Sequence, residues 1–268
     1  MTARSIENAS PGLSRREVEL LATWERARKR AVTVQDIREA LGDAAAKKVA
    51  HSLVRKHALE RVARGVYLVR PFRTLLRPST SSSAVLISVF LHGESHYLGG
   101  LWALTWHGLT EQQHASIIDA FVTRRHKTVP PSLAKARFHL VSPAAAESGI
   151  QTVEIEQVKV QVSDPERTLL DLLDYPRLAG SISQALKLVE LSLDRVDAQK
   201  LIAYALGGSS TSTCQRLGVL LERRGTSARR VASLHSKARS RESLLSMSPG
   251  SPRKGPMNAR WNVIENDR

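Results

Sequence analysis

The chain of 268 residues contains a single cysteine, Cys214, and few aromatic residues. One cysteine excludes an intramolecular disulfide and a zinc site built on cysteine pairs. Aromatic residues make up 4% of the sequence, which disfavours a protein that stacks single-stranded RNA bases. No apolar run reaches the ~18 residues of a transmembrane helix, and the N-terminal stretch MTARSIENASPG lacks the apolar core of a signal peptide. We therefore expect a soluble, cytoplasmic protein without membrane contact.

Sequence signatures of nucleotide chemistry are also missing. No Gly-x-x-x-x-Gly-Lys phosphate-binding loop occurs, and no Gly-Ser segment precedes an Asp-x-Asp pair, so a nucleotidyltransferase metal site has no candidate. His92, His96 and His107 are four and eleven residues apart, which matches the paired spacing of zinc ligands poorly. We predict no catalytic residues, no metal and no cofactor, and expect that the chain is not an enzyme.

Positive charge is abundant and unevenly distributed. Lys and Arg number 40 against 25 Asp and Glu, a formal net charge of +15. The net charge is +9 over residues 1–77, −1 over residues 78–220 and +7 over residues 221–268. Two basic ends around a near-neutral middle indicate contact with a polyanion at one or both ends. Segment 70–83, with two prolines and a serine run, predicts a linker between domain 1–77 and domain 78–268.

Three short helices are predicted in the first domain. Residues 13–29 place apolar side chains at helical spacing. A second helix begins after Thr33 as its N-cap, with Asp36 where a capping box would have Glu or Gln, and ends at Gly42. Asp43 is then expected as the N-cap of a third helix.

The third helix, residues 44–57, carries an apolar stripe on one side and basic residues mostly on the other. Two short strands follow around Ala63-Arg64-Gly65. The order helix–helix–helix–hairpin is that of a winged helix-turn-helix, whose third helix enters the major groove while basic side chains and the wing contact phosphates. We predict as DNA-binding the basic residues of these two elements: Lys47, Lys48, His51, Arg55, Lys56, Arg61 and Arg64.

The middle of the chain predicts a mixture of helices and strands. SAVLISVFLHGESHYLGGLWALTWHGLTEQQ indicates a helix, a glycine-marked break and a second helix. ASIIDAFVT and ARFHLVS are strand-like, and TVEIEQVKVQVS alternates with period two around Glu156-Gln157, which is typical of a hairpin.

VSDPERTLLDLLDYP is rich in carboxylates that an active site would also use. Ser163 as N-cap and Glu166 at the third helical position would form a capping box, and Asp164 would favour the positive end of the helix dipole. Helix formation thus accounts for these acids without catalysis. As an alternative, a metal-dependent nuclease with a DNA-targeting head could use Glu154, Glu156 and Asp164, which lie near predicted strands.

The remaining sequence is mainly helical. ISQALKLVELSL, DAQKLIAYAL and TCQRLGVLLERRG each show apolar residues at three- and four-residue spacing. A basic amphipathic segment and a Pro- and Gly-rich loop follow, and Trp261, Val263 and Ile264 are candidates for a closing strand. The predicted fold class is α+β: an N-terminal winged helix-turn-helix, then a larger mixed, mainly helical domain with a small β-sheet.

Five segments, in this order, resemble the AbiEi family: LVRKHALERVARGVYLV, HYLGGLWALTWHGLT, VSDPERTLLDLLDYP, RLGVLLERRG and GPMNARWNVIEN. The family comprises antitoxins and autoregulators of type IV toxin–antitoxin systems, first met as bacterial phage-defence operons. The resemblance implies an N-terminal winged helix that binds inverted repeats of double-stranded DNA in its own promoter and represses the operon. It also implies a C-terminal domain that assists repression and neutralises a nucleotidyltransferase-like toxin without a stable complex.

Inverted repeats imply two copies on DNA, with a monomer in solution remaining possible. One departure from the family pattern is the strongly basic segment 222–254, which would offer a second nucleic-acid surface. Its basic residues include Arg223, Arg224, Arg229, Arg230, Lys237, Arg239 and Arg241.

Overall fold

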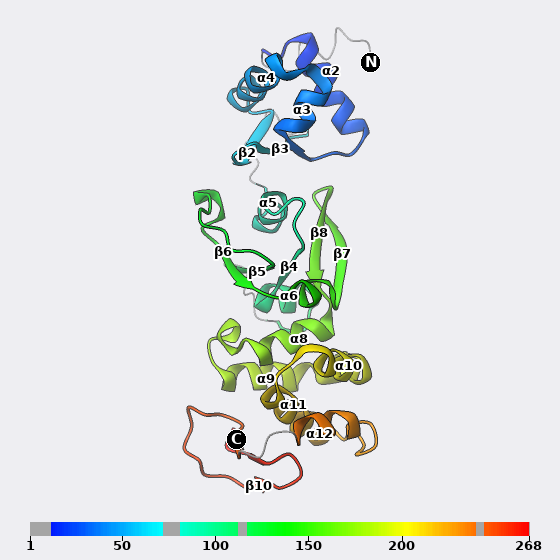
Figure 1. Cartoon of the computed structure of the whole chain (residues 1–268), viewed down its shortest axis with the longest axis vertical. Coiled ribbons are helices and arrows are strands. Elements are labelled where there is room, and N and C mark those ends of the chain that lie inside the picture. Colours follow the sequence, from blue (N-terminus) through cyan, green and yellow to red (C-terminus); the bar gives the residue numbers. More distant parts are fainter. Residues whose placement is uncertain (1–11, 72–80, 112–116, 240–243, 268) are drawn as a thin grey trace. The chain divides into compact units, whose positions relative to one another are not determined.

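The computed structural model describes residues 12–71, 81–111, 117–239 and 244–267 (Figure 1). The chain is a mixed α+β protein that divides into two compact units. Unit 1 comprises Met1–Glu94, His126–Ala136 and Thr152–Val160, and unit 2 comprises Ser95–Arg125, Arg137–Gln151 and Gln161–Arg268. Most of the predicted linker, residues 72–80, lies outside the described residues.

Helices and a small sheet alternate in the first part of unit 1. In chain order these elements are α2 (Arg15–Arg26), β1 (Ala31–Thr33), α3 (Val34–Leu41), α4 (Asp43–Arg55), β2 (Leu59–Ala63), β3 (Val66–Val69) and α5 (Ser83–Phe90). The predicted helices and hairpin are confirmed, with Gly65 at the hairpin turn in a positive-φ conformation (+77°). The structure adds the three-residue strand β1, which pairs antiparallel with β3 and gives the sheet order β1-β3-β2.

Side-chain caps set the starts of α2 and α3. Ser14 and Glu17 form a capping box on α2, in which the Glu17 carboxylate accepts from the Ser14 N–H at 2.7 Å. Thr33 is the N-cap of α3, as predicted, and Asp36 completes its capping box in place of Glu or Gln. Both boxes satisfy N–H groups that have no partner inside the helix.

The predicted N-cap of α4 is wrong by one residue. Gly42, at φ +83°, ends α3 and is the N-cap of α4, whereas Asp43 is the first helical residue. Glycine adopts this backbone conformation without steric cost, so the chain turns from one helix directly into the next. The Asp43 carboxylate instead forms an ion pair with Arg38 at 3.2 Å.

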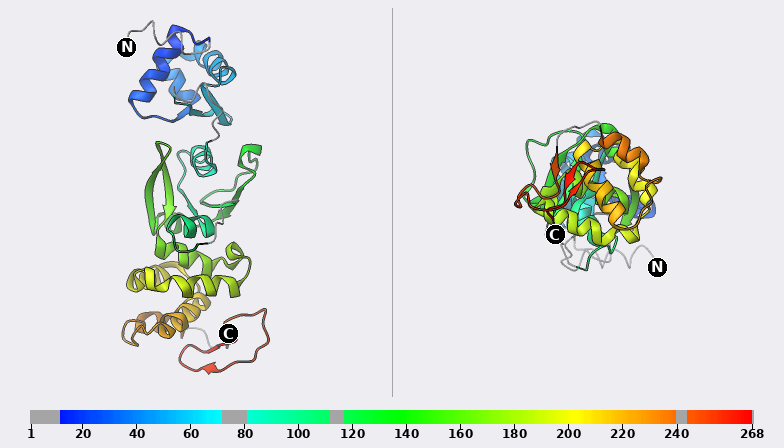
Figure 2. Two further views of the ribbon diagram at one scale, coloured as in Figure 1. Left: turned by 180° about the vertical axis from the view of Figure 1, so that it is seen from behind. Right: turned by 90° about the horizontal axis from the view of Figure 1, so that it is seen from below.

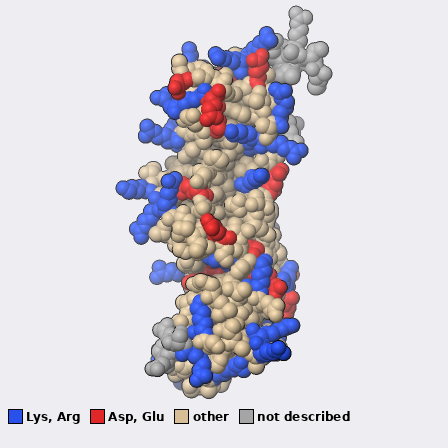
Figure 3. Space-filling view, turned by 45° about the vertical axis from the view of Figure 1, so that its right-hand side comes forward, with Lys and Arg blue, Asp and Glu red and all other residues tan. Residues whose placement is uncertain are grey.

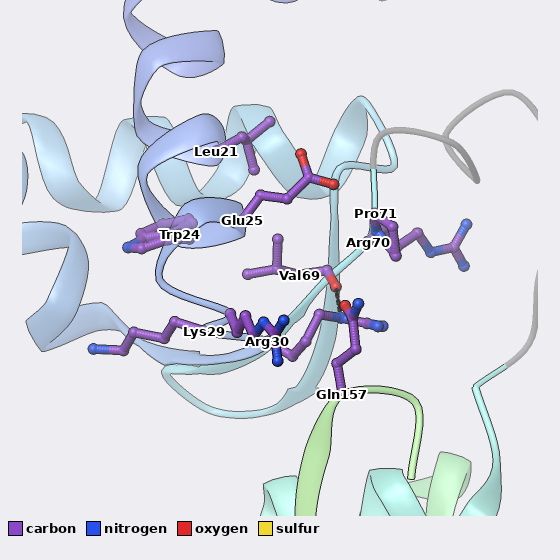
Figure 4. Close-up of a pocket in the computed structure, with 10 residues that line it drawn as sticks. Leu21, Trp24, Glu25, Lys29, Arg30, Val69, Arg70, Pro71 and Gln157 are labelled. Carbon is purple, nitrogen blue, oxygen red and sulfur yellow. Dashed lines mark hydrogen bonds between the residues drawn. The ribbon is translucent and has the colours of Figure 1, made fainter. Parts of the chain in front are cut away.

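Apolar faces of α2, α3, α4 and β3 form the core of the first part of unit 1. Leu21, Trp24, Ile37 and Leu53 are among its buried side chains. Figure 4 shows where α2 ends beside β3: Arg30 Nε donates to the Val69 carbonyl at 2.6 Å. The cavity drawn there is about 10 Å³, room for a single water molecule at most.

A five-stranded sheet has the order β6-β5-β4-β8-β7. Its strands are β4 (His96–Gly99), β5 (Ile118–Val122), β6 (Ala136–Leu140), β7 (Ile150–Ile155) and β8 (Val158–Ser163). The predicted strands in ASIIDAFVT and ARFHLVS are confirmed as β5 and β6. The predicted hairpin is confirmed as β7–β8, and its turn residues Glu156 and Gln157 both have positive φ. The segment between α5 and α6 was predicted as a glycine-marked break, but its residues HYLG form the central strand β4. This strand pairs antiparallel with β5 and parallel with β8.

Helices make up most of unit 2 (Figure 2). They are α6 (Gly100–Trp106), α7 (Pro143–Glu147), α8 (Pro165–Asp174), α9 (Ile182–Ser192), α10 (Ala198–Gly208), α11 (Thr211–Arg223) and α12 (Ala232–Ala238), with 3-10 turns η2 (Pro131–Leu133, in unit 1), η3 (Pro176–Ala179) and η4 (Leu193–Arg195). The three predicted C-terminal helices correspond to α9, α10 and α11. Leucines of α8 to α11 form one buried core with Tyr97 and Phe121 of the sheet.

The predicted start of α8 is also shifted by one residue. The N-cap is Asp164, whose side chain accepts from the Arg167 N–H at 2.8 Å, and not Ser163. Ser163 is the last residue of β8, and its hydroxyl lies 2.8 Å from that of Thr168. Because β8 continues through Ser163, the first residue free to cap the helix is Asp164.

A small sheet follows α12 at the C-terminal end of the chain. It contains β9 (Leu245–Ser246), β10 (Met257–Asn258) and β11 (Val263–Ile264), in the order β10-β11-β9. The predicted closing strand is β11, while Trp261 lies before it and is buried against Gly218 of α11. Within the described ranges, no helix is long and apolar enough to cross a membrane.

Candidate nucleic-acid interface

The exposed face of α4 is basic. Lys47, Lys48, His51 and Arg55 are all exposed, whereas Ala46, Ala50 and Leu53 of the same helix are buried. The 3.6-residue period of the helix separates the two sets because the apolar residues face α2 and α3. Each of the four basic residues is therefore available to a molecule that approaches this helix.

Part of this basic face lines a groove with the β2–β3 hairpin, which we call the α4–hairpin groove. Its basic side chains are Arg38, Lys47, His51, Arg61 and Arg64. The other residues that line it are Val34, Val54, Gly65 and Tyr67. Five basic residues from one helix pair and one hairpin thus gather on one open surface, which favours an anionic partner.

Arg38 also lines this groove, although no pattern in the sequence predicts it there. The residue lies on α3, whose exposed face carries no basic cluster, so periodicity alone gave no signal. The turn at Gly42 brings α3 and α4 together, and Arg38 is held near the groove by its ion pair with Asp43. Its side chain remains 39% exposed.

Lys56 is placed differently from the other predicted DNA-binding residues. Its ammonium group forms an ion pair with Glu17 of α2 at 2.7 Å, and the Glu17 side chain is only 6% exposed. Burial opposes ionisation of Glu17, but hydrogen bonds from Lys56 and from the Ser14 backbone lower the pKa of its carboxyl to about 2. Lys56 therefore joins the end of α4 to α2.

The carboxylates of the segment 163–176 are held in structural contacts. The second oxygen of Asp164 accepts from Tyr204 at 2.8 Å, and Lys200 bridges Asp164 and Glu166 at 3.0 and 2.8 Å. Asp174 accepts from the hydroxyls of Ser209 and Thr213 at 2.7 Å each. These bonds fasten α8 to α10 and α11.

Asp171 is fully buried in a network of three polar groups. Its carboxylate accepts from Arg167 Nε at 2.8 Å and from the Tyr97 hydroxyl at 3.0 Å, and Arg167 also donates to that hydroxyl. Burial raises the pKa of Asp171 above its usual value in spite of the neighbouring guanidinium. The network joins α8 to the central strand β4.

The residues of the alternative nuclease site do not assemble into a metal-binding cluster in the described ranges. Glu154 and Glu156 are exposed on the β7–β8 hairpin, and Asp164 is the N-cap of α8. His107 contacts the Ser163 carbonyl at 2.7 Å. Among the residues that the structure describes, no three His, Cys, Asp or Glu side chains come close enough to hold a metal ion.

Several basic residues of segment 222–254 have acidic or carbonyl partners. Arg223 is mostly buried between Glu265 and Asp267, at 2.7 Å from each, and Arg224 pairs with Asp194 at 2.9 Å. Lys237 donates to the last carbonyls of α10. The remaining predicted residues in the described ranges are exposed: Arg229, Arg230 and Arg239. Arg241 lies outside them.

Lys and Arg side chains are spread over the surface of both units on the face drawn in Figure 3. The α4–hairpin groove differs from this general distribution because basic side chains of α3, α4 and the β2–β3 hairpin line one surface there. The groove is therefore the strongest candidate site for a nucleic acid in the described chain.

Comparisons with known proteins show the family of the chain. Residues 19–70 match the family model described as a transcriptional regulator, AbiEi antitoxin, and residues 98–223 match the AbiEi antitoxin C-terminal domain. A search of curated proteins finds no match to the chain. The crystal structure of RV2827C protein from Mycobacterium tuberculosis is similar in fold, with a TM-score of 0.62, 15% identity, and coverage of 94% of this chain and 92% of that one. The two family matches extend over both units, and the chain belongs to the AbiEi family of antitoxins and transcriptional regulators.

Proposed function

We propose that residues 1–77 form a winged helix-turn-helix that binds duplex DNA and represses the operon that encodes the protein. The observation that supports this proposal is the α4–hairpin groove, where a helix and a hairpin present basic side chains to the same surface. In a winged helix the third helix enters the major groove and the hairpin, or wing, lies on the backbone. Here those elements are α4 and β2–β3.

The proposed contacts divide into two kinds. Lys47, Lys48, His51 and Arg55, exposed on α4, would face base edges and the phosphates that flank them. Arg61 and Arg64, exposed on the hairpin, would contact the sugar-phosphate backbone. Lys56 has no place among these contacts because Glu17 holds it.

We further propose that residues 78–268 carry the antitoxin function and oppose a nucleotidyltransferase-like toxin without a stable complex. Two copies of the chain would occupy inverted repeats in the promoter. The family matches support an antitoxin and regulator, and neither proposed role requires a catalytic site. The toxin part is tested by co-expression with the product of the neighbouring gene, read as rescue of growth, together with a pull-down between the two proteins.

The DNA part is tested by fluorescence anisotropy with the upstream DNA of the gene and a scrambled duplex of equal length. We expect tighter binding to the upstream DNA, and a slope of log affinity against log salt of about −0.9 for each phosphate neutralised. Lys47→Ala and Arg55→Ala should each weaken binding, by ~1–3 kcal/mol where a base contact is lost. Arg64→Ala should weaken binding to both duplexes alike.

A matched control is Lys187→Ala, which removes one exposed positive charge from α9 in unit 2. Its affinity should equal that of the wild type. Equal loss in Lys187→Ala and Lys47→Ala would mean that net charge alone drives binding. Equal affinity of the wild type for both duplexes at high salt would contradict sequence-specific repression.

A further inference from the structure

Unit 2 contains a cavity that the DNA-binding proposal does not use. It has a volume of about 390 Å³ and lies among α7, α8 and α10, and we call it the α8–α10 cavity. Its size falls in the range of roughly 300–1,000 Å³ that small-molecule sites occupy. The residues of its wall that decide its chemistry are Arg167, Leu170, Asp174, Tyr175, Tyr204 and Gly207.

Arg167 supplies a buried cation with one unused end. The residue is 9% exposed. Its Nε and Nη2 atoms donate to Asp171 and to the Tyr97 hydroxyl. Its third nitrogen, Nη1, donates to no protein group among the residues that the structure describes. Guanidinium N–H groups pair with carboxylates more strongly than with neutral acceptors, so the vacant donors select an anionic group.

Asp174 supplies the opposite charge in the same cavity. Its two oxygens accept from Ser209 and Thr213 and keep further lone pairs for another donor. Seven residues separate it from Arg167 along α8, about 10.5 Å at 1.5 Å per residue. Two helical turns bring both residues to the same side of α8, and both side chains line the cavity.

The rest of the wall is uncharged and open. Tyr175 and Tyr204 present aromatic rings, and burial raises the pKa of the Tyr175 hydroxyl, which keeps it protonated as a donor. Gly207 and Gly208 lie in the last turn of α10, and a Cβ atom at either would meet nothing within 4 Å. Neither packing nor a positive φ requires these glycines, and their effect is to leave one side of the cavity without side chains.

We propose that the α8–α10 cavity binds a free α-amino acid. The carboxylate pairs with Arg167 Nη1, the ammonium group pairs with Asp174, and the side chain lies against Tyr175, Tyr204 and Leu170. An anion alone is disfavoured by the carboxylates of Asp171 and Asp174, and a cation alone by the Arg167 guanidinium, so a molecule that carries both charges fits the cavity best. The proposal is independent of DNA binding, which uses other residues.

The test is a thermal-shift screen of the full-length protein against the twenty standard amino acids, with acetate and methylammonium as single-charge probes. Isothermal titration then gives the dissociation constant of any amino acid that raises the melting temperature. Gly207→Leu fills the open side of the cavity and suits a helix better than glycine does. Gly250→Leu is its matched control, because a Cβ at Gly250 also meets nothing within 4 Å and that residue lies outside the cavity.

We expect at least one amino acid to bind wild type and Gly250→Leu, and to lose binding in Gly207→Leu. Asp174→Asn, checked for folding by circular dichroism, should weaken binding by about tenfold or more because the ammonium loses its partner. Tyr175→Phe, which removes a hydroxyl without a protein partner in the described ranges, should weaken binding less. The proposal fails if no amino acid shifts the melting temperature, if Gly207→Leu binds as wild type does, or if acetate alone binds as well as the amino acid.

Discussion

The ammonium group of Lys56 lies 2.7 Å from the carboxylate of Glu17, and this pair joins the end of α4 to the start of α2. Glu17 also accepts from the Ser14 N–H, so one carboxylate caps α2 and anchors the proposed recognition helix. The position of α4 in the fold thus depends on a residue 39 positions earlier in the chain.

Glu17→Gln should lower the free energy of unfolding by about 2 kcal/mol at neutral pH. The folded-state pKa of Glu17, about 2, lies below its usual 4.5, so its contribution is present above pH 4.5 and is lost as the pH falls toward 2. Urea unfolding at pH 7 and pH 3 should therefore show a smaller difference from wild type at pH 3. A difference independent of pH would contradict the role of the ionised carboxylate.

Arg38→Ala should weaken binding to promoter DNA although Arg38 lies on α3. Its side chain lines the α4–hairpin groove and remains partly exposed beside Asp43. If it neutralises one phosphate, the slope of log affinity against log salt should become less steep by about 1. Arg177→Ala in unit 2, another exposed arginine, serves as the control. An unchanged slope in Arg38→Ala would remove this residue from the interface.

Lys56→Met should reduce stability more than it reduces DNA affinity. The substitution leaves the mostly buried Glu17 carboxylate without its cation. Removal of one partner from a buried ion pair typically lowers the free energy of unfolding by ~3–5 kcal/mol. Anisotropy below the unfolding temperature should show near-wild-type affinity in the folded fraction. A specific loss of affinity at unchanged stability would return Lys56 to the DNA contacts.

Tyr97→Phe should destabilise unit 2 by ~1–3 kcal/mol. The tyrosine hydroxyl donates to Asp171 and accepts from Arg167, and its loss leaves polar atoms of both residues unsatisfied in the core. Denaturant unfolding measures the change. Tyr67→Phe, at a half-buried position of β3, is the control and should change stability little.

Gly218→Ala should destabilise the C-terminal sheet strongly, because an added Cβ would overlap the buried ring of Trp261. Overpacking of this kind typically costs ~1–3 kcal/mol. Gly207→Ala, where the same methyl group meets open space, should instead raise stability by ~0.5–1 kcal/mol through better helix propensity. Tryptophan fluorescence during thermal unfolding distinguishes the two.

Local sequence predicted most helices and the hairpins because their signals are short-range. The 3.6-residue period located α2, α3 and α4, and the Thr33 cap fixed one helix start. β4 was missed for a physical reason: all four of its residues are buried, so no apolar–polar alternation marks it as a strand. The predicted caps at Asp43 and Ser163 were wrong because several polar residues near each helix start can serve as a cap.

The sequence by itself determined the helical periods, the basic ends of the chain and the family to which it belongs. Tertiary structure decided which basic side chains are available. Glu17 holds Lys56, Glu265 and Asp267 hold Arg223, and the turn at Gly42 adds Arg38 to the groove. A charge count cannot separate these cases, because an ion pair depends on distances between residues far apart in the chain, and packing alone sets those distances.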